Sequence, residues 1–427
     1  MSDIYHELYR LYRGTEADTL RQYRDLVDLF PPLDSTIALE RWQEARRELE
    51  DRQSEIRQDF DSGDAFAEIA AIATMEQAFT ALDLYNKYER EVNVLVVDVD
   101  ETLRSAGGTD NEIPRETLHQ ITELHESGMP IVVCTGQTLE NVKGFTIQGL
   151  GNELVHSGRL SIVYEGGSGV FTPRHGTETK NLLYEDLPSD VVSRFQSVRS
   201  RLISDMPSDL RSRVHLQGNE FNVTVKPNDE TGSDRAVETI DRALPHLLEE
   251  IGRTLPGTDG FERAAAYYAN ADPEIANALE SEVAVEEIRT RLDAEYTPDE
   301  WSSAPDLPDE IRTALDQVDV GYYRGDAVEM ASAKLHKVAG VRAAFDVLDI
   351  DSPFALVLGD SKSDLRVMEW VAERDIGIAA APEHASNQVL FHVKNRDNLV
   401  YDRGGADQIF RSIRAMQEIA DVQSIDG

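Results

Sequence analysis

The sequence predicts an α/β protein built on a doubly wound parallel sheet, with an inserted α+β domain and a helical extension at the N-terminus. Three observations predict this class. Short apolar runs recur from Val92 onward, and each has the length of a strand buried on both faces. Segments with helical periodicity separate these runs, as crossover helices separate parallel strands. Before Val92 the chain shows helical periodicity alone.

These patterns divide the chain into four segments. With 427 residues the chain is long enough for two or three domains. Residues 1–90 are predicted to form the helical extension, 91–176 and 326–427 the two parts of the core, and 177–325 the inserted domain.

The N-terminal extension is predicted to be wholly helical. Pro31 and Pro32 interrupt its periodicity, and Ser35 can then cap a long helix. A second helix is expected over 66–82, beyond a turn at Ser62-Gly63, so that the two pack as an antiparallel hairpin. The extension is either a dimerisation or partner-docking module, which would produce a homo-oligomer, or an accessory layer on the core.

The core elements follow from the apolar runs between turn residues. A glycine turn, G-G-S-G at 166–169, follows the third run. Helices are expected over 115–127, 334–348 and 406–419, and strands over 94–97, 130–134, 160–164, 354–358 and 375–379. Within the inserted domain, residues 215–217 and 221–225 are expected to form antiparallel strands around Gly218-Asn219, with a further strand at 320–323.

Acidic side chains follow two of the predicted core strands. Asp98 and Asp100 come directly after the run at 94–97, and Asp360 and Asp364 lie in G-D-S-K-S-D (359–364) after another run. The carboxyl ends of parallel strands meet at one edge of a sheet, where such folds bind ligands. Carboxylates gathered there repel one another unless a cation is present, and Mg²⁺ prefers oxygen ligands. The sequence therefore predicts a magnesium site.

A phosphate site is expected beside the acids. Thr135 and Gly136 follow the second strand and offer a hydroxyl and a backbone N–H that can hold a phosphate. Lysine occurs at only eight positions, so a positive charge for the phosphate has few sources. Lys337 lies on the helix before the Asp360 strand and Lys334 lies one turn earlier, and either could supply this charge.

Together these motifs resemble those of the haloacid dehalogenase (HAD) superfamily of phosphatases. D-V-D-E-T (98–102) resembles the first motif, Thr135 in C-T-G-Q the second, Lys337 the third and G-D-S-K-S-D the fourth. The insertion between the second and third motifs resembles the large cap of the Cof-like and sucrose-phosphatase branch. The segments V-Y-E-G-G-S-G (163–169) and V-E-M-A-S-A-K-L-H-K (328–337) are similar to that branch's entry to and exit from the cap.

The resemblance covers about residues 92–400 and departs from the family pattern at two positions. Glu101 stands where glycine is common, a change that is tolerable if the side chain points outward. Gln137 stands where arginine usually follows Thr-Gly, so a substrate contact at that position is in doubt.

The resemblance implies a HAD-like Rossmannoid core and a role for each motif. Asp98 would be the nucleophile that forms an aspartyl-phosphate, and Asp100 the general acid and base. Mg²⁺ would be held by Asp98, the backbone carbonyl of Asp100 and Asp360, with Asp364 binding a metal water or the lysine. Charge on the phosphoryl oxygens would be stabilised by Thr135, Gly136 and Lys337.

The function expected from this resemblance is Mg²⁺-dependent hydrolysis of a small phosphorylated metabolite. A sugar phosphate is favoured by analogy with the branch. A phosphomutase or phosphotransferase of the same superfamily shares the motifs and is the first alternative. A non-enzymatic ligand-binding or scaffold protein is the second.

Composition limits the partners and the setting. The net charge is -38, with acidic residues dispersed along the chain, which resembles proteins of salt-adapted organisms; an acidic partner-binding protein is the alternative. No basic stripe exists to bind nucleic acid. The single cysteine, Cys134, excludes internal disulfides and Cys-based zinc sites. Without a signal peptide or a run of about 20 apolar residues, we expect a cytoplasmic protein with no membrane contact.

Overall fold

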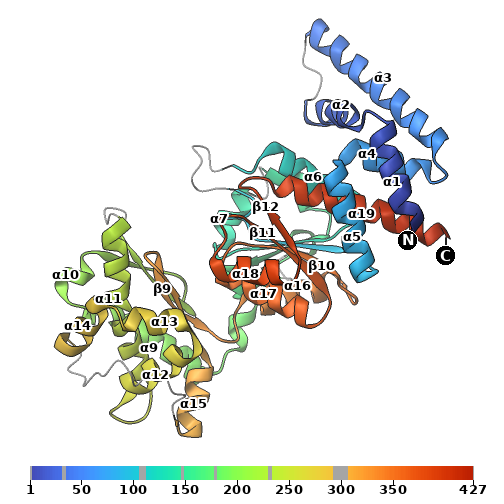
Figure 1. The fold of residues 1–427 in the computed structure, drawn as a ribbon. Coiled ribbons are helices and arrows are strands. Elements are labelled where there is room, and N and C mark those ends of the chain that lie inside the picture. The colour runs from blue at the N-terminus through green and yellow to red at the C-terminus, as the bar shows by residue number, and fades with distance from the viewer. Residues whose placement is uncertain are drawn as a thin grey trace. The chain divides into compact units, whose positions relative to one another are not determined.

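The chain is organised as two compact units. The computed structural model describes residues 2–30, 35–104, 112–145, 149–176, 180–228, 233–291 and 306–426. Contacts group Met1–Asn181 with Gly340–Gly427 in the first unit, and Leu182–Ala339 form the second unit. Each unit has its own sheet, and the ribbon of each can be followed in Figure 1.

The first unit is built on a mostly parallel eight-stranded sheet. Its order is β12-β11-β10-β1-β2-β3-β4-β5. Strand β1 lies between β10 and β2 and is parallel to both, so the strand order reverses at β1, the position where open α/β sheets form their binding crevice. The strands are β1 (Val94–Val97), β2 (Ile131–Cys134), β3 (Leu160–Tyr164), β4 (Gly169–Phe171), β5 (Asn181–Leu182), β10 (Ala355–Leu358), β11 (Gly377–Pro382) and β12 (Leu399–Tyr401).

Helices cover both faces of this sheet, which explains why its central strands are uninterrupted apolar runs. Every residue of β1, β2, β3 and β10 is buried. In Figure 1, α17 and α18 lie on one face, and α6 and α19 on the other. The helices of this core are α6 (Arg115–Glu126), α7 (Leu139–Phe145), α8 (Gly151–Val155), α16 (Lys337–Val347), α17 (Lys362–Glu373), α18 (Asn387–Asn395) and α19 (Ala406–Asp426), with 3-10 turns η2 (Glu165–Gly167) and η3 (Pro173–His175).

The predicted sheet was incomplete in two respects. The strand β4 pairs antiparallel with β3, so the sheet is mixed instead of wholly parallel. The glycine turn at 166–169 leads directly into β4, which is too short for its apolar residues to stand out as a run. On the other edge, β12 pairs parallel with β11, whereas β11 was expected to be the last strand.

Among the described residues the N-terminal extension comprises five helices, and the second helix of the expected hairpin is divided between two of them. The predicted helix over 66–82 is broken, because Thr74 accepts from the Gln77 backbone and Gln77 from the Thr74 backbone, a capping box that starts a new helix. Ser35 stands at the N-cap of α3, but its side chain makes no capping hydrogen bond to the described residues. Pro31 and Pro32 lie outside those residues. The helices are α1 (Ser2–Gly14), α2 (Ala17–Leu29), α3 (Thr36–Asp59), α4 (Gly63–Ile72) and α5 (Met75–Tyr88).

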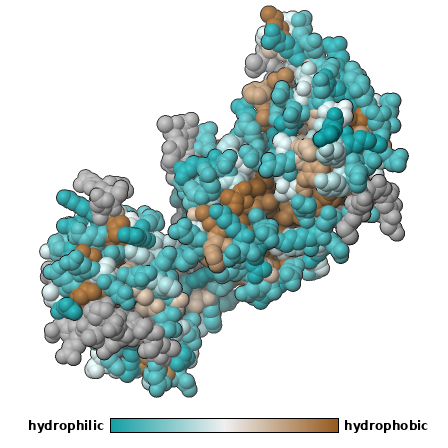
Figure 2. Space-filling model, in the orientation of Figure 1, coloured by the Kyte–Doolittle hydropathy of each residue, from teal (hydrophilic) through white to brown (hydrophobic). Residues whose placement is uncertain are grey.

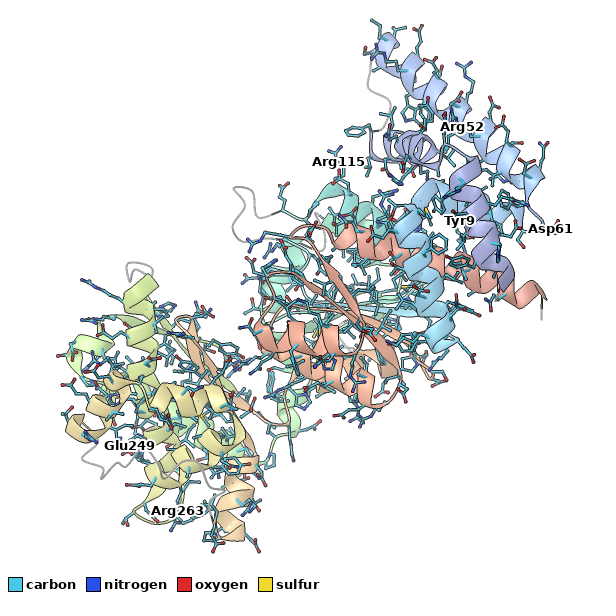
Figure 3. All side chains as sticks on the ribbon, viewed as in Figure 1. Tyr9, Arg52, Asp61, Arg115, Glu249 and Arg263 are labelled. Atoms are coloured by element: carbon cyan, nitrogen blue, oxygen red, sulfur yellow. The ribbon has the colours of Figure 1, made fainter. Side chains whose placement is uncertain are left out.

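These helices pack on the core of the first unit. Arg411 of α19 is 5% exposed and donates to the Ile72 carbonyl and to Asp25. Arg115, labelled in Figure 3, donates from α6 to the carbonyl of Leu29. Arg52, also labelled there, pairs with Glu48 on α3 and with Glu16, which precedes α2. The extension is therefore an additional helical layer on the first unit.

The second unit has an α+β fold with a separate core. Its antiparallel sheet has the order β6-β7-β9-β8, and the predicted hairpin turns at Gly218, whose φ is +91°. Apolar side chains of its helices and strands form a continuous buried cluster. The elements are β6 (Val214–Gln217), β7 (Asn222–Pro227), β8 (Val318–Tyr323), β9 (Ala327–Ser332), η5 (Leu183–Asp186), α9 (Ser189–Asp205), α10 (Ser208–Arg211), α11 (Ser233–Gly252), α12 (Gly260–Ala271), α13 (Pro273–Leu279), α14 (Glu282–Arg291) and α15 (Asp309–Asp316).

The face of each unit seen in Figure 2 is predominantly polar. Figure 2 shows hydrophilic residues over most of the visible face of each unit, with apolar residues confined to patches. Among the described residues no helix is both long and apolar enough to cross a membrane.

Candidate active site

Three carboxylates meet at the carboxyl ends of β1 and β10. Asp98 follows β1, Asp360 follows β10, and Asp364 lies in the first turn of α17. One oxygen from each lies within 4.8 Å of the other two. The register explains this proximity, since Val97 pairs with Leu358 and the two parallel strands therefore end side by side. Asp98, Asp360 and Asp364, three of the four residues predicted to hold a metal, therefore lie together at this edge.

Burial increases the free-energy cost of keeping all three carboxylates ionised. Asp98 is 7% exposed and Asp364 is 3% exposed, while Asp360 is half-buried. Like charges that are close and poorly solvated repel strongly unless a cation or proton offsets them. A cluster of carboxylate oxygens at this spacing is a donor set suited to Mg²⁺, so the residues fit the predicted ion.

Asp364 is held in place by the turn that begins α17. Its Oδ2 accepts from the backbone N–H of Ser361 at 3.1 Å and from the Ser361 hydroxyl at 2.6 Å. Gly359 allows the close approach, because a Cβ at that position would lie 2.2 Å from the Cβ of Asp364. The motif G-D-S-K-S-D therefore contains a helix cap and a space for the carboxylate as well as two acids.

Asp360 lies near Thr102, which is distant from it in the sequence, and Tyr401 in turn contacts Thr102. The Thr102 hydroxyl donates to its Oδ1 at 3.2 Å. Tyr401, on β12, donates to the Thr102 carbonyl at 3.3 Å. The pKa of the Tyr401 hydroxyl is raised well above its ordinary value, first by burial and then by Asp360 and the other two carboxylates. Thr102 and Tyr401 thus border the acidic group.

The Asp100 side chain is turned toward a different set of partners. Its Oδ1 accepts from Nε and Nη2 of Arg104 at 2.9 and 2.7 Å. Its Oδ2 accepts from Nε2 of Gln137 at 2.5 Å. The two acids of D-V-D therefore have different surroundings. Asp98 belongs to the three-carboxylate group, and Asp100 accepts hydrogen bonds from one neutral and one cationic side chain.

Glu101 occupies a position that favours glycine. Its φ is +56°, in the left-handed region that side chains rarely adopt. Its carboxylate lies 3.2 Å from Nε2 of His384 and 3.8 Å from Nη2 of Arg403. The Glu101 carboxylate therefore lies beside His384 and Arg403.

The groups predicted to bind phosphate differ in their surroundings. Thr135 is buried, and its hydroxyl accepts from the backbone N–H of Gln137 at 3.1 Å. Gly136 is exposed. Lys337 begins α16 and is 4% exposed, whereas Lys334 is exposed. Contacts assign both lysines to the second unit.

The sequence reasoning missed several residues of this site. The contact of Arg104 with Asp100 could have been predicted, because a cation four residues after an acid in a tight turn commonly pairs with that acid. The contact of Ser361 with Asp364 could have been predicted too, since serine three residues before an acid is typical of a helix start. The contact of Tyr401 could not, since it lies 299 residues from Thr102, its partner.

Comparisons with known proteins find similarity only to solved structures. No family model and no curated protein matches the sequence. A HAD subclass IIB sugar phosphatase, BT4131, is 14% identical with a TM-score of 0.41, over 77% of this chain and 100% of that one. A trehalose-6-phosphate phosphatase of Aspergillus fumigatus is 12% identical with a TM-score of 0.41, over 79% and 97%. The protein TM0651 of Thermotoga maritima is 14% identical with a TM-score of 0.40, over 75% and 96%.

Proposed function

We propose that this chain is a Mg²⁺-dependent phosphatase that hydrolyses a small phosphorylated metabolite through an aspartyl-phosphate. The observation that supports the proposal is that the two acids of D-V-D have different surroundings. Asp98 is buried and belongs to a group of three carboxylates, whereas the Asp100 side chain accepts hydrogen bonds from Arg104 and Gln137. A nucleophile beside a cation and a separate acid and base are the two functions that phosphate ester hydrolysis requires.

The magnesium ion would be held by Asp98, Asp360 and Asp364, together with the backbone carbonyl of Asp100. When bound, the ion supplies positive charge that offsets the carboxylates and the phosphoryl oxygens. The Ser361 cap on Asp364 and the Thr102 hydroxyl on Asp360 orient these carboxylates.

The reaction would proceed in two steps. A carboxylate oxygen of Asp98 forms a bond to phosphorus, the bond from phosphorus to the leaving oxygen breaks, and Asp100 gives its proton to the departing alcohol. A water molecule then attacks phosphorus, Asp100 takes the proton from that water, and inorganic phosphate leaves as the Asp98 carboxylate is restored. The sum is one ester and one water converted to one alcohol and one phosphate.

Thr135, Gly136 and Lys337 would bind the transferred phosphoryl group. A hydroxyl and a backbone N–H after β2 provide neutral donors, and lysine provides the positive charge. The burial of Lys337, against the exposure of Lys334, supports the choice of Lys337, because an exposed lysine is solvated and little constrained.

A sugar phosphate is the substrate class we propose. The support is the resemblance to the Cof-like and sucrose-phosphatase branch, in which a large inserted cap covers the site. The second unit, with its own sheet and core, corresponds to such an insertion.

The proposal extends to the protein's setting. The net charge of -38 and the rarity of lysine support work in a cytoplasm of high ionic strength, where salt screens self-repulsion. We also propose that the N-terminal helices form a homo-oligomer, which a monomeric mass in solution would contradict.

Replacement of the nucleophile tests the central proposal. Asp98→Asn should abolish hydrolysis across a panel of phosphate esters with Mg²⁺ in high salt, while circular dichroism shows an unchanged fold. Asp351→Asn, at an exposed aspartate of the same unit, is the matched control and should keep full activity. Turnover that persists in Asp98→Asn would contradict the proposed nucleophile.

Two further outcomes separate the alternatives. If phosphate released in ¹⁸O-labelled water contains the label, water is the acceptor and the protein is a phosphatase. If the phosphoryl group instead returns to sugar without the label, the protein is a phosphomutase. If the panel shows no hydrolysis at all, a ligand-binding or scaffold role is favoured.

A further inference from the structure

The hydrogen bonds around Asp100 distinguish its two carboxylate oxygens. Oδ1 accepts two N–H groups of Arg104, at 2.9 and 2.7 Å. Oδ2 accepts one N–H of Gln137, at 2.5 Å. An ionised carboxylate oxygen has about two lone-pair sites. Among the described contacts, Oδ1 is therefore fully used, and Oδ2 keeps one site on which a proton can be carried.

Both donors are themselves fixed by the backbone. The N–H of Gln137 donates to the Thr135 hydroxyl at 3.1 Å, and its carbonyl accepts from Glu165 at 2.8 Å. The N–H of Arg104 donates to the Val99 carbonyl at 3.1 Å, and its side chain is 16% exposed. Both donors are thus anchored on turns that follow β1 and β2, and together they limit the rotation of the Asp100 carboxylate, whose side chain is 43% exposed.

The chemistry of the Gln137 side chain determines which way it faces. An ionised carboxylate only accepts hydrogen bonds, so the amide nitrogen of Gln137 faces Oδ2 and its amide oxygen points away. A neutral amide fixes the direction of Oδ2 without bringing a second cation to the carboxylate, which already has Arg104.

We propose that Gln137 and Arg104 are positioning residues that make Oδ2 of Asp100 the oxygen that exchanges the proton in the reaction. The inference rests on the proposed function, since it assigns the proton transfer of that function to one atom. In the first step the O–H bond at Oδ2 breaks as the leaving oxygen gains the proton. In the second step Oδ2 takes a proton from the attacking water.

The dependence of rate on the leaving group tests this assignment. The constant kcat/KM covers steps up to the first irreversible one, which is formation of the aspartyl-phosphate with loss of the alcohol. A sugar phosphate releases a strongly basic alkoxide that needs a proton, whereas p-nitrophenyl phosphate releases a weakly basic phenolate that needs almost none. Loss of Asp100 positioning should therefore reduce kcat/KM for the sugar phosphate selectively.

Gln137→Met keeps the length of the side chain and removes its N–H donors. We expect kcat/KM to fall about 10- to 100-fold for the alkyl ester and less than about threefold for p-nitrophenyl phosphate. Arg104→Met should show the same selectivity, and Arg104→Lys, which keeps a donor, should restore part of the loss. Glu101→Gln, which alters the neighbouring side chain pairs with His384 and Arg403, is the matched control and should leave the ratio of the two constants unchanged.

The outcomes separate this inference from the function on which it rests. If wild-type protein hydrolyses neither ester, or if Asp98→Asn keeps activity, the proposed function fails. If wild-type protein is active but Gln137→Met affects both esters equally or neither, the function stands and the positioning role is overturned. Retained hydrolysis of p-nitrophenyl phosphate also shows that each variant is folded.

Discussion

Substitution of Gly359 by alanine should damage the magnesium site without removing any ligand. The added Cβ would lie 2.2 Å from the Cβ of Asp364, 2.4 Å from its Cγ and 2.9 Å from its Oδ2. Carbon atoms in contact are normally about 3.5–4.0 Å apart. Either Asp364 or the backbone of Gly359 must therefore move by more than about 1 Å.

The surroundings leave few ways to accommodate that movement. Asp364 is 3% exposed, and Ser361 holds its Oδ2 with two hydrogen bonds. Overpacking of this kind costs about 1–3 kcal/mol of folding stability. Mg²⁺ requires near-octahedral ligands at about 2.0–2.1 Å, and displaced supporting groups lower metal affinity by about 10- to 100-fold.

The assay is the Mg²⁺ concentration that gives half-maximal hydrolysis, together with the free energy of unfolding in urea. Gly359→Ala should raise the first by about 10- to 100-fold and lower the second. Gly14→Ala is the matched control, because a Cβ there meets nothing within 4 Å. If Gly359→Ala shows the wild-type magnesium dependence and stability, the conclusion that glycine is required for the Asp364 approach is wrong.

Two further predictions concern stability. Arg411→Met should lower the free energy of unfolding by about 2–3 kcal/mol, because Arg411 is buried and donates to Asp25 of the N-terminal extension; Arg46→Met, which breaks an exposed pair on α3, should cost less than about 0.5 kcal/mol, and equal effects of the two would refute the anchoring role. Burial, reinforced by Glu68, raises the pKa of Glu418 from 4.5 to about 7. The unfolded chain then releases this proton before the folded chain does, so stability falls as pH rises between those values. In Glu418→Gln the decrease in the free energy of unfolding between about pH 5 and about pH 8 should be smaller by about 1–2 kcal/mol, after allowance for the partial exposure of Glu418. Urea unfolding at the two pH values measures this decrease, and an unchanged decrease would contradict the raised pKa of Glu418.

Features set by near neighbours in the chain could be predicted from the sequence. The central strands were found because four successive apolar residues predict a doubly covered strand. The meeting of Asp98 and Asp360 followed, since parallel strands that pair in register end at the same edge.

Features that depend on residues distant in the sequence could not be predicted. The edge strand β12 has three residues and becomes a strand only by pairing with β11. The hydrogen bond from Tyr401 to Thr102 could therefore not be predicted from the sequence. The break at Thr74, by contrast, is a local feature, because its capping box joins residues only three positions apart; the helical pattern on both sides of it made the break easy to overlook.

The sequence by itself determined which acids lie at the sheet edge and which chemistry they resemble, because motif residues and apolar runs are local. Only the tertiary structure decided that Asp100 is held by Arg104 and Gln137 while Asp98 joins Asp360 and Asp364. The physical reason is that a carboxylate's orientation depends on which donors the fold brings within about 3 Å of it, and Gln137 reaches Asp100 from the end of a different strand.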